Sequence, residues 1–182
     1  AVAVSDRATD RIGVLFNTAT GRKYLGERCG VPDDVLAGLP SLGLSSICNL
    51  LAAIKTAKYY ELGPEDVIVT VATDGASLYE SEQELALARY FPQGFDEVAA
   101  AGVFGEHLLG AATDHFQELG HRDRDRIFNL GYYTWVEQQG ISVEDFVARR
   151  DPAFWAGILE VVPVWDDLID EMNARTGVLG AL

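Results

Sequence analysis

The chain has few cysteines, few basic residues and no long apolar run, and each shortage disfavours a class of protein. Its two cysteines, Cys29 and Cys48, form no CxxC pair, which favours a reducing compartment, so we expect a cytoplasmic protein. No run reaches the roughly 18 consecutive apolar residues that a membrane span needs. Lysine and arginine total 14 against 28 acidic residues, and the net charge of −14 argues against nucleic acid or an anionic membrane as a partner, because like charges repel.

A helix with a defined start and stop is predicted from Ser45 and Ser46 to Gly63. Ser45 and Ser46 can cap its first turn, because a serine hydroxyl accepts a hydrogen bond from a free backbone N–H group. Gly63 and Pro64 can end it, since glycine adopts the left-handed conformation and proline cannot continue the hydrogen-bond ladder. Between them, apolar residues recur every three or four positions on one face: Ile47, Leu50, Leu51, Ile54 and Ala57.

A buried strand is predicted directly after this helix. Residues 67–71 read Val-Ile-Val-Thr-Val, which is nearly continuous in β-branched residues and typical of a parallel strand covered on both faces. Thr73, Asp74 and Gly75 would then turn the chain at the carboxyl end of the strand. Ligands of open α/β sheets bind at the carboxyl ends of strands, and helix N-termini attract anions. Residues 44–46 and 73–76 are therefore the two candidate ligand-binding loops.

The whole chain divides into an α/β part and a helical part. Residues 1–4 resemble a second buried strand, followed by a helix to about residue 18, whereas residues 21–40 are rich in glycine and charge and indicate at most a short helix. After residue 80 no strand-length run of valine and isoleucine appears, and helices are expected at 81–90, 95–119, 123–139, 143–149 and 152–175. We therefore predict an α/β fold, part of a parallel sheet with flanking helices, in residues 1–81, and an α-helical extension in residues 82–182.

The first residues also bear on the extent of the protein. A buried strand that begins at the very first residue, as predicted for residues 1–4, is uncommon, since chain termini usually fray at the surface. We expect the chain to be a fragment, a processed subunit or half of a split protein.

Three segments of the α/β part resemble the C-terminal part of the fold-type II pyridoxal-phosphate enzymes, which include cysteine synthase and threonine synthase. The segments are VAVSD, GLSSICNLLAAIK and VIVTVATDGASLYES, and they occur in the order of the family at similar spacing. The resemblance implies β-elimination or β-replacement on a small amino acid, catalysed by a lyase or synthase with pyridoxal 5′-phosphate. It also implies that the cofactor cleft is lined by Leu44, Ser45 and Ser46, with Thr73, Asp74 and Gly75 beside the pyridine nitrogen.

The chain departs from the family pattern in ways that affect this chemistry. Gly75 stands where the family commonly has serine, so Thr73 or Asp74 would have to bond the ring nitrogen, and threonine would leave a poorer electron sink than aspartate. The Schiff-base lysine in its S-x-K-type setting and the glycine-rich phosphate loop are both missing, and the chain has no Gly-Gly pair. The resemblance therefore implies that another chain or segment supplies both parts, in a homo- or hetero-oligomer.

Each of these sites also has a simpler explanation. Ser45 and Ser46 can be helix caps alone, and residues 73–75 can be an ordinary turn. A carboxylate–histidine metal site at Glu118 and His121 is disfavoured, because Gly120 should end the helix between them and bundle sites normally need two such motifs. The alternative to an enzyme is a non-catalytic acidic module whose helical tail mediates assembly.

Overall fold

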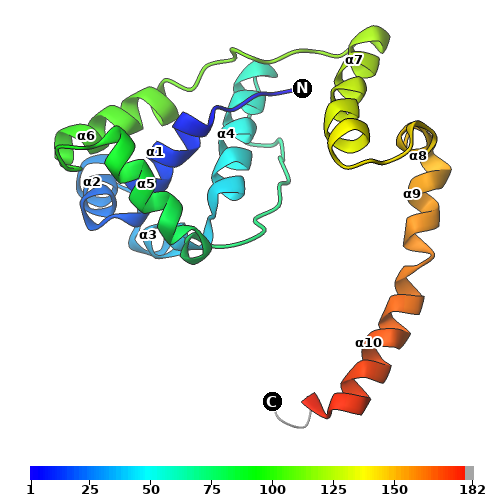
Figure 1. Ribbon diagram of the computed structural model, residues 1–182. Helices are drawn as coiled ribbons and strands as arrows, with labels where there is room; N and C mark the ends of the chain where they lie inside the picture. Colours follow the sequence, from blue (N-terminus) through cyan, green and yellow to red (C-terminus); the bar gives the residue numbers. More distant parts are fainter. Residues whose placement is uncertain (179–182) are drawn as a thin grey trace. The chain divides into compact units, whose positions relative to one another are not determined.

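The computed structural model describes residues 1–178, and the chain divides into two compact units, Ala1–Glu118 and Leu119–Leu182 (Figure 1). The helices of the first unit are α1 (Asp6–Asn17), α2 (Ala19–Cys29), α3 (Asp33–Gly38), α4 (Leu44–Tyr59), α5 (Glu80–Tyr90) and α6 (Glu97–Val103), with short turns η1 (Leu39–Ser41), η2 (Ala76–Tyr79) and the π-helical η3 (Phe104–Leu109). Those of the second unit are α7 (His121–Tyr132), the π-helical turn η4 (Tyr133–Gln138), α8 (Val143–Ala148), α9 (Pro152–Leu159) and α10 (Val162–Thr176).

The predicted α/β fold is wrong, because the structure is 70% helical and its described residues contain no sheet. Their one isolated bridge joins Val2 to Phe116, so the predicted first strand has no ladder. Residues 67–71 run without regular structure, and Val67 and Val69 are 83% and 88% exposed. The β-branched composition suits a strand, but a strand forms only when a neighbour pairs with its backbone groups. Within residues 1–178 no neighbour does so.

Helix α1 lies at the centre of the first unit, in contact with α2, α4, α5 and α6 (Figure 1). It begins as predicted, since the Ser5 side chain accepts a hydrogen bond from the Ala8 N–H group. Ile12, Val14 and Leu15 are completely buried. The other buried members of the surrounding core come from η1 and the neighbouring helices: Leu25, Leu39, Ile47, Leu51, Ala100 and Val103.

Helix α2 occupies a region that the sequence predicts to be mostly irregular. Thr18 caps it by accepting a hydrogen bond from the Gly21 N–H group, and Gly30 ends it at φ +69°. Gly21 also permits the close approach of α1 and α2, because a Cβ atom there would overlap the Leu15 carbonyl group. The glycines that suggested a loop therefore serve a helix end and a tight helix contact.

Several predicted helix boundaries also differ from the structure. Helix α4 has Gly43 at its N-cap and no side-chain cap, so the capping roles predicted for Ser45 and Ser46 are wrong. It ends at Tyr59, and Glu61 rather than Gly63 takes the left-handed conformation, at φ +53°. The predicted helix 95–119 stops near Gly110. The last predicted helix, 152–175, is divided between Leu159 and Val162, as expected from Pro163, which cannot continue a helix. No helix within residues 1–178 has both the length and the apolar character that crossing a membrane requires.

The central position of α1 predicts that its core side chains dominate the stability of the first unit. Leu15→Ala should lower the free energy of unfolding by about 2–5 kcal/mol, because it leaves a cavity among four helices. Leu85→Ala, a matched change at a leucine of α5 that is 61% exposed, should change it by no more than about 0.5 kcal/mol. Urea denaturation followed by circular dichroism measures both. Equal losses in the two variants would show that α1 is not the centre of the core.

Candidate functional site

The structure brings the two candidate loops together at the start of α4. The Ser45 Oγ and Thr73 Oγ1 atoms lie 2.9 Å apart, although the residues are 28 positions apart in the sequence. The backbones of the two loops are also joined, because the Gly43 N–H group donates to the Asp74 carbonyl oxygen at 2.8 Å. Asn49, one turn into α4, donates from Nδ2 to the Val71 carbonyl oxygen at 3.0 Å. These bonds hold residues 71–74 along the first turns of α4.

Asp74 links the contact between Ser45 and Thr73 to η2, the turn that follows. Its Oδ2 atom accepts a hydrogen bond of 2.9 Å from the Tyr79 hydroxyl, and its Oδ1 atom accepts one of 3.3 Å from Thr73 Oγ1. If the single Thr73 hydrogen points to Asp74, Ser45 must be the donor to Thr73. The four side chains then form one chain of hydrogen bonds, from Ser45 through Thr73 to Asp74 and from Tyr79 to Asp74.

Glycine at position 43 is required by this packing. A Cβ atom there would lie 2.5 Å from Asp74 Oδ1 and 2.8 Å from Tyr79 Cε2, closer than nonbonded atoms approach. The backbone conformation, φ −74°, is open to any residue, so the requirement is one of space. Gly43 therefore sets how closely Asp74 and Tyr79 approach α4.

The remaining predicted site residues differ in their access to solvent. Ser45 and Thr73 are exposed, whereas Leu44, Asp74 and Gly75 are half-buried. Gly75 lies against η1, where an added Cβ atom would stand 3.1 Å from the Pro40 carbonyl oxygen. Ser46 is buried, and its hydroxyl has no hydrogen-bond partner among residues 1–178. The exposed face of the site therefore presents the hydroxyls of Ser45 and Thr73.

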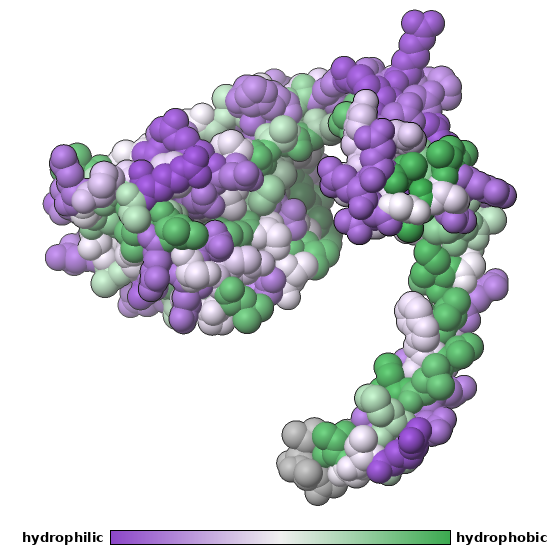
Figure 2. Space-filling view, viewed as in Figure 1, coloured by the Kyte–Doolittle hydropathy of each residue, from purple (hydrophilic) through white to green (hydrophobic). Residues whose placement is uncertain are grey.

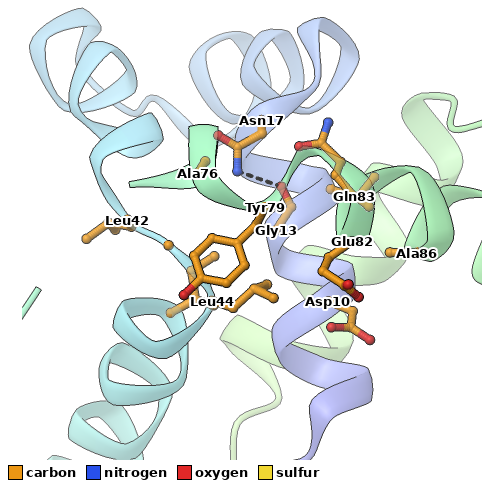
Figure 3. A pocket seen from close by; sticks show the side chains of 13 residues that line it. Asp10, Gly13, Asn17, Leu42, Leu44, Ala76, Tyr79, Glu82, Gln83 and Ala86 are labelled. Atoms are coloured by element: carbon orange, nitrogen blue, oxygen red, sulfur yellow. Dashed lines mark hydrogen bonds between the residues drawn. The ribbon is translucent and has the colours of Figure 1, made fainter. Parts of the chain in front are cut away.

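A small pocket lies among α1, the start of α4, η2 and α5 (Figure 3). Its cavity measures about 20 Å³, which holds one water-sized molecule and is far below the volume of a cofactor site. Asp10 and Glu82 line one side of it, and burial raises the pKa of Asp10 above its ordinary value, with the neighbouring Asp6 and Glu82 carboxylates adding to the effect. This pocket is therefore too small to hold a cofactor.

The three histidines do not form a common site. His107 is largely buried in η3, where its Nε2 atom lies 3.1 Å from Arg11 Nη1, and burial lowers its pKa. His115 lies 3.3 Å from Asp114, and His121 lies 3.8 Å from Asp125. Within residues 1–178, no three histidine, cysteine or acidic side chains are grouped closely enough to hold a metal ion.

Two residues of the site were missed by reasoning from the sequence. They are Tyr79 and Gly43, which both lie inside the segments that carry the family resemblance. The signal for Tyr79 is its position five residues after Asp74, across a turn that returns its side chain to the carboxylate. The signal for Gly43 was not available, because a close approach between distant segments cannot be read from local sequence.

No protein-family model matches this chain, and no curated protein or solved structure matches it significantly. The functional interpretation therefore depends on the geometry of the site and on the resemblance carried by its segments.

The Tyr79–Asp74 bond predicts a loss of stability at high pH. The hydrogen bond to Asp74 raises the pKa of Tyr79 above its ordinary value near 10, with desolvation adding to it. A raised folded-state pKa means that the contribution of the phenol is complete below about pH 10 and is lost as the pH rises through the folded-state value. The stability advantage of the natural chain over Tyr79→Phe should therefore be constant up to about pH 10 and shrink above it. Urea denaturation of both chains at several pH values measures this, and a constant difference above pH 10 would contradict it.

Gly43→Ala should destabilise the first unit, because the new methyl group displaces Asp74 and the Tyr79 ring. Gly38→Ala is the matched control, since Gly38 has φ −79° and no atom within 4 Å of an added Cβ. Removing glycine there should be neutral or stabilise the fold by about 0.4–1 kcal/mol. The absorbance change of phenol ionisation should also show the Tyr79 pKa returning toward its ordinary value in Gly43→Ala alone. Equal behaviour of the two variants would show that position 43 has no special requirement for space.

Proposed function

We propose that this chain is the C-terminal subunit or fragment of an enzyme that uses pyridoxal 5′-phosphate for β-elimination or β-replacement on a small amino acid. The Schiff-base lysine and the phosphate loop would come from another chain or segment. The observation that carries the proposal is the 2.9 Å contact between Ser45 and Thr73. It joins two loops, distant in sequence, that resemble the two cofactor loops of the fold-type II enzymes.

The donors and acceptors of the site fit the pyridine edge of the cofactor. Thr73 is exposed and can reach a ligand, whereas both carboxylate oxygens of Asp74 already accept hydrogen bonds. The bond from Thr73 to Asp74, at 3.3 Å, is the longest in the chain of hydrogen bonds. The Thr73 hydroxyl would therefore turn to the ring nitrogen, while Asp74 and Tyr79 hold the loop in place. Of the two candidates, the geometry favours Thr73 as the contact.

The start of α4 would contribute the rest of the protein surface at the cofactor. The helix has no side-chain cap, and its first turn contains no acidic residue. The positive N-terminal end of the helix dipole is therefore not neutralised by an acidic side chain of this turn. Ser45 adds an exposed hydroxyl there and Ser46 adds a buried one that lacks a partner among the described residues. Bound pyridoxal phosphate supplies the electron sink of the reaction, and these residues would orient it.

A second polypeptide segment is also needed for physical reasons. Residues 67–71 lead directly into Thr73, and four of these five residues are exposed and apolar. Covering them would exclude water from the side of the site next to Thr73. The segment that carries the lysine and phosphate loop is the partner we propose for this surface. We place the assembled enzyme in the cytoplasm, where the free thiols of Cys29 and Cys48 would stay reduced.

A non-catalytic assembly module is the second candidate function. It is favoured by the described part of the second unit, residues 119–178, in which Phe146 is the single buried side chain. A unit with so little buried core is expected to gain buried surface by binding another protein. The two candidates differ in what they require at Thr73, since assembly alone needs no cofactor there.

Absorbance spectra of the protein purified together with its bound partners test the proposal. We expect a band near about 420 nm and a second polypeptide, seen by intact mass, that carries the reactive lysine. Thr73→Ala should shift or weaken the band, whereas Ser77→Ala, at an exposed hydroxyl of η2, should leave it unchanged. A colourless protein of 19.8 kDa with no second polypeptide would contradict the proposal and favour the assembly module.

A further inference from the structure

The second unit exposes far more apolar surface than a small helical unit can leave in water. Helices α7, α9 and α10 have no buried residue, and α8 contributes Phe146 alone. Helix α9 carries no charged side chain, and its Trp155 and Leu159 are exposed. Figure 2 shows apolar side chains along α9 and α10 on the face turned to the viewer. Exposed patches of this kind mark sites of interaction.

Three apolar residues of α10 and the apolar residue at its N-cap lie along one line of the helix surface. Val161, Trp165, Leu168 and Met172 follow one another at intervals of four, three and four residues, so they align along the helix as an apolar stripe, here called the α10 stripe. Trp165, Leu168 and Met172 are each more than half exposed. The spacing is that of a helix whose face packs against another helix.

The charges around the α10 stripe are predominantly acidic. Helical spacing places Asp166 beyond one edge of the stripe and Glu171 beyond the other, with Asp167 and Asp170 on the opposite face. Residues 151–176 contain six acidic side chains and one basic side chain, Arg175. Arg175 lies 3.8 Å from Glu171, and the two form an exposed ion pair. The segment around the stripe is therefore net acidic, with Asp166 beyond one edge and the Glu171–Arg175 pair beyond the other.

We propose that the α10 stripe docks an amphipathic helix of another protein, whose apolar face is flanked by lysine and arginine. Basic flanks would face Asp166 and Glu171, as oppositely charged flanking residues do in paired helices. A second copy of this chain would instead bring two net acidic segments together, which costs affinity. An anionic membrane surface would be repelled by the same charges. The inference concerns a different surface from the proposed cofactor site and does not depend on it.

Two synthetic helical peptides provide the test. Both carry the same leucine stripe at helical spacing, one with lysine and the other with glutamate at the flanking positions. Fluorescence anisotropy of the labelled peptides measures their binding to the full chain in about 0.15 M salt, where long-range charge effects are screened. We expect the lysine peptide to bind at least about tenfold more tightly.

Variants of exposed residues assign the binding to the stripe. Trp165→Ser combined with Leu168→Ser should weaken binding of the lysine peptide by at least about tenfold, since both side chains would lie in the interface. Leu78→Ser combined with Leu85→Ser is the matched control, because these leucines of the first unit are 72% and 61% exposed. Asp166→Asn with Glu171→Gln should reduce the difference between the two peptides. Circular dichroism should be unchanged in all three variants.

Four results would overturn the proposal. Equal binding of the two peptides would remove the role of charge, and no binding of either would remove the docking site. A dimer of the chain that dissociates on Trp165→Ser with Leu168→Ser would assign the stripe to a second copy. Binding to phosphatidylcholine vesicles, lost in the same variant, would assign it to a lipid surface.

Discussion

Burial of α1 is the constraint on which the first unit depends. Three of its side chains, Ile12, Val14 and Leu15, are fully removed from water, and each buried side chain of this size contributes about 1.5–3 kcal/mol. Four helices contact α1, so their positions are set by a common surface. Helix α4 is one of them, and its start is therefore fixed before any ligand binds. The candidate site is built on that fixed start.

The loop at residues 71–75 has little core of its own and is held by polar contacts. Asn49 and Gly43 of the α4 region bond its backbone, and Ser45 bonds the Thr73 side chain. Tyr79 holds Asp74 from the other side. The apolar residues just before this loop remain exposed, so the loop is hydrogen-bonded at one end and uncovered at the other. This asymmetry is the physical reason to expect that the site is completed by a second polypeptide segment.

Local features of the sequence match some local features of the structure, although the caps predicted at Ser45 and Ser46 are not formed. Ser5 caps α1, Ser142 caps α8 and Asp151 caps α9, each through a hydrogen bond that its residue type and position indicate. Reasoning failed where the outcome depends on neighbours. Residues 67–71 have a strand-forming composition but find no partner strand in residues 1–178, and the glycines of α2 serve packing rather than turns. The division into residues 1–81 and 82–182 stays a prediction about the extent of the cofactor domain.

The site was predicted as two loops, and the structure adds how they are joined. Residue types and the family resemblance singled out Ser45 and Thr73, but their 2.9 Å contact requires the path of the chain in three dimensions. The same path explains Gly43, whose missing side chain makes room for Asp74 and Tyr79. Neither feature has a local sequence signal, because each depends on segments about 30 positions apart.

Hydrogen exchange followed by mass spectrometry tests the central claim most directly. The protein, purified with its bound partners and freed of any bound cofactor, would be compared with and without pyridoxine 5′-phosphate, which lacks the aldehyde and so cannot react with surface lysines. If the joined loops hold the cofactor, exchange should slow together in peptides covering residues 44–49 and residues 71–76, and stay unchanged in α10. Unchanged exchange in both loops, or slowing in one of them alone, would contradict the claim that they form one cofactor site.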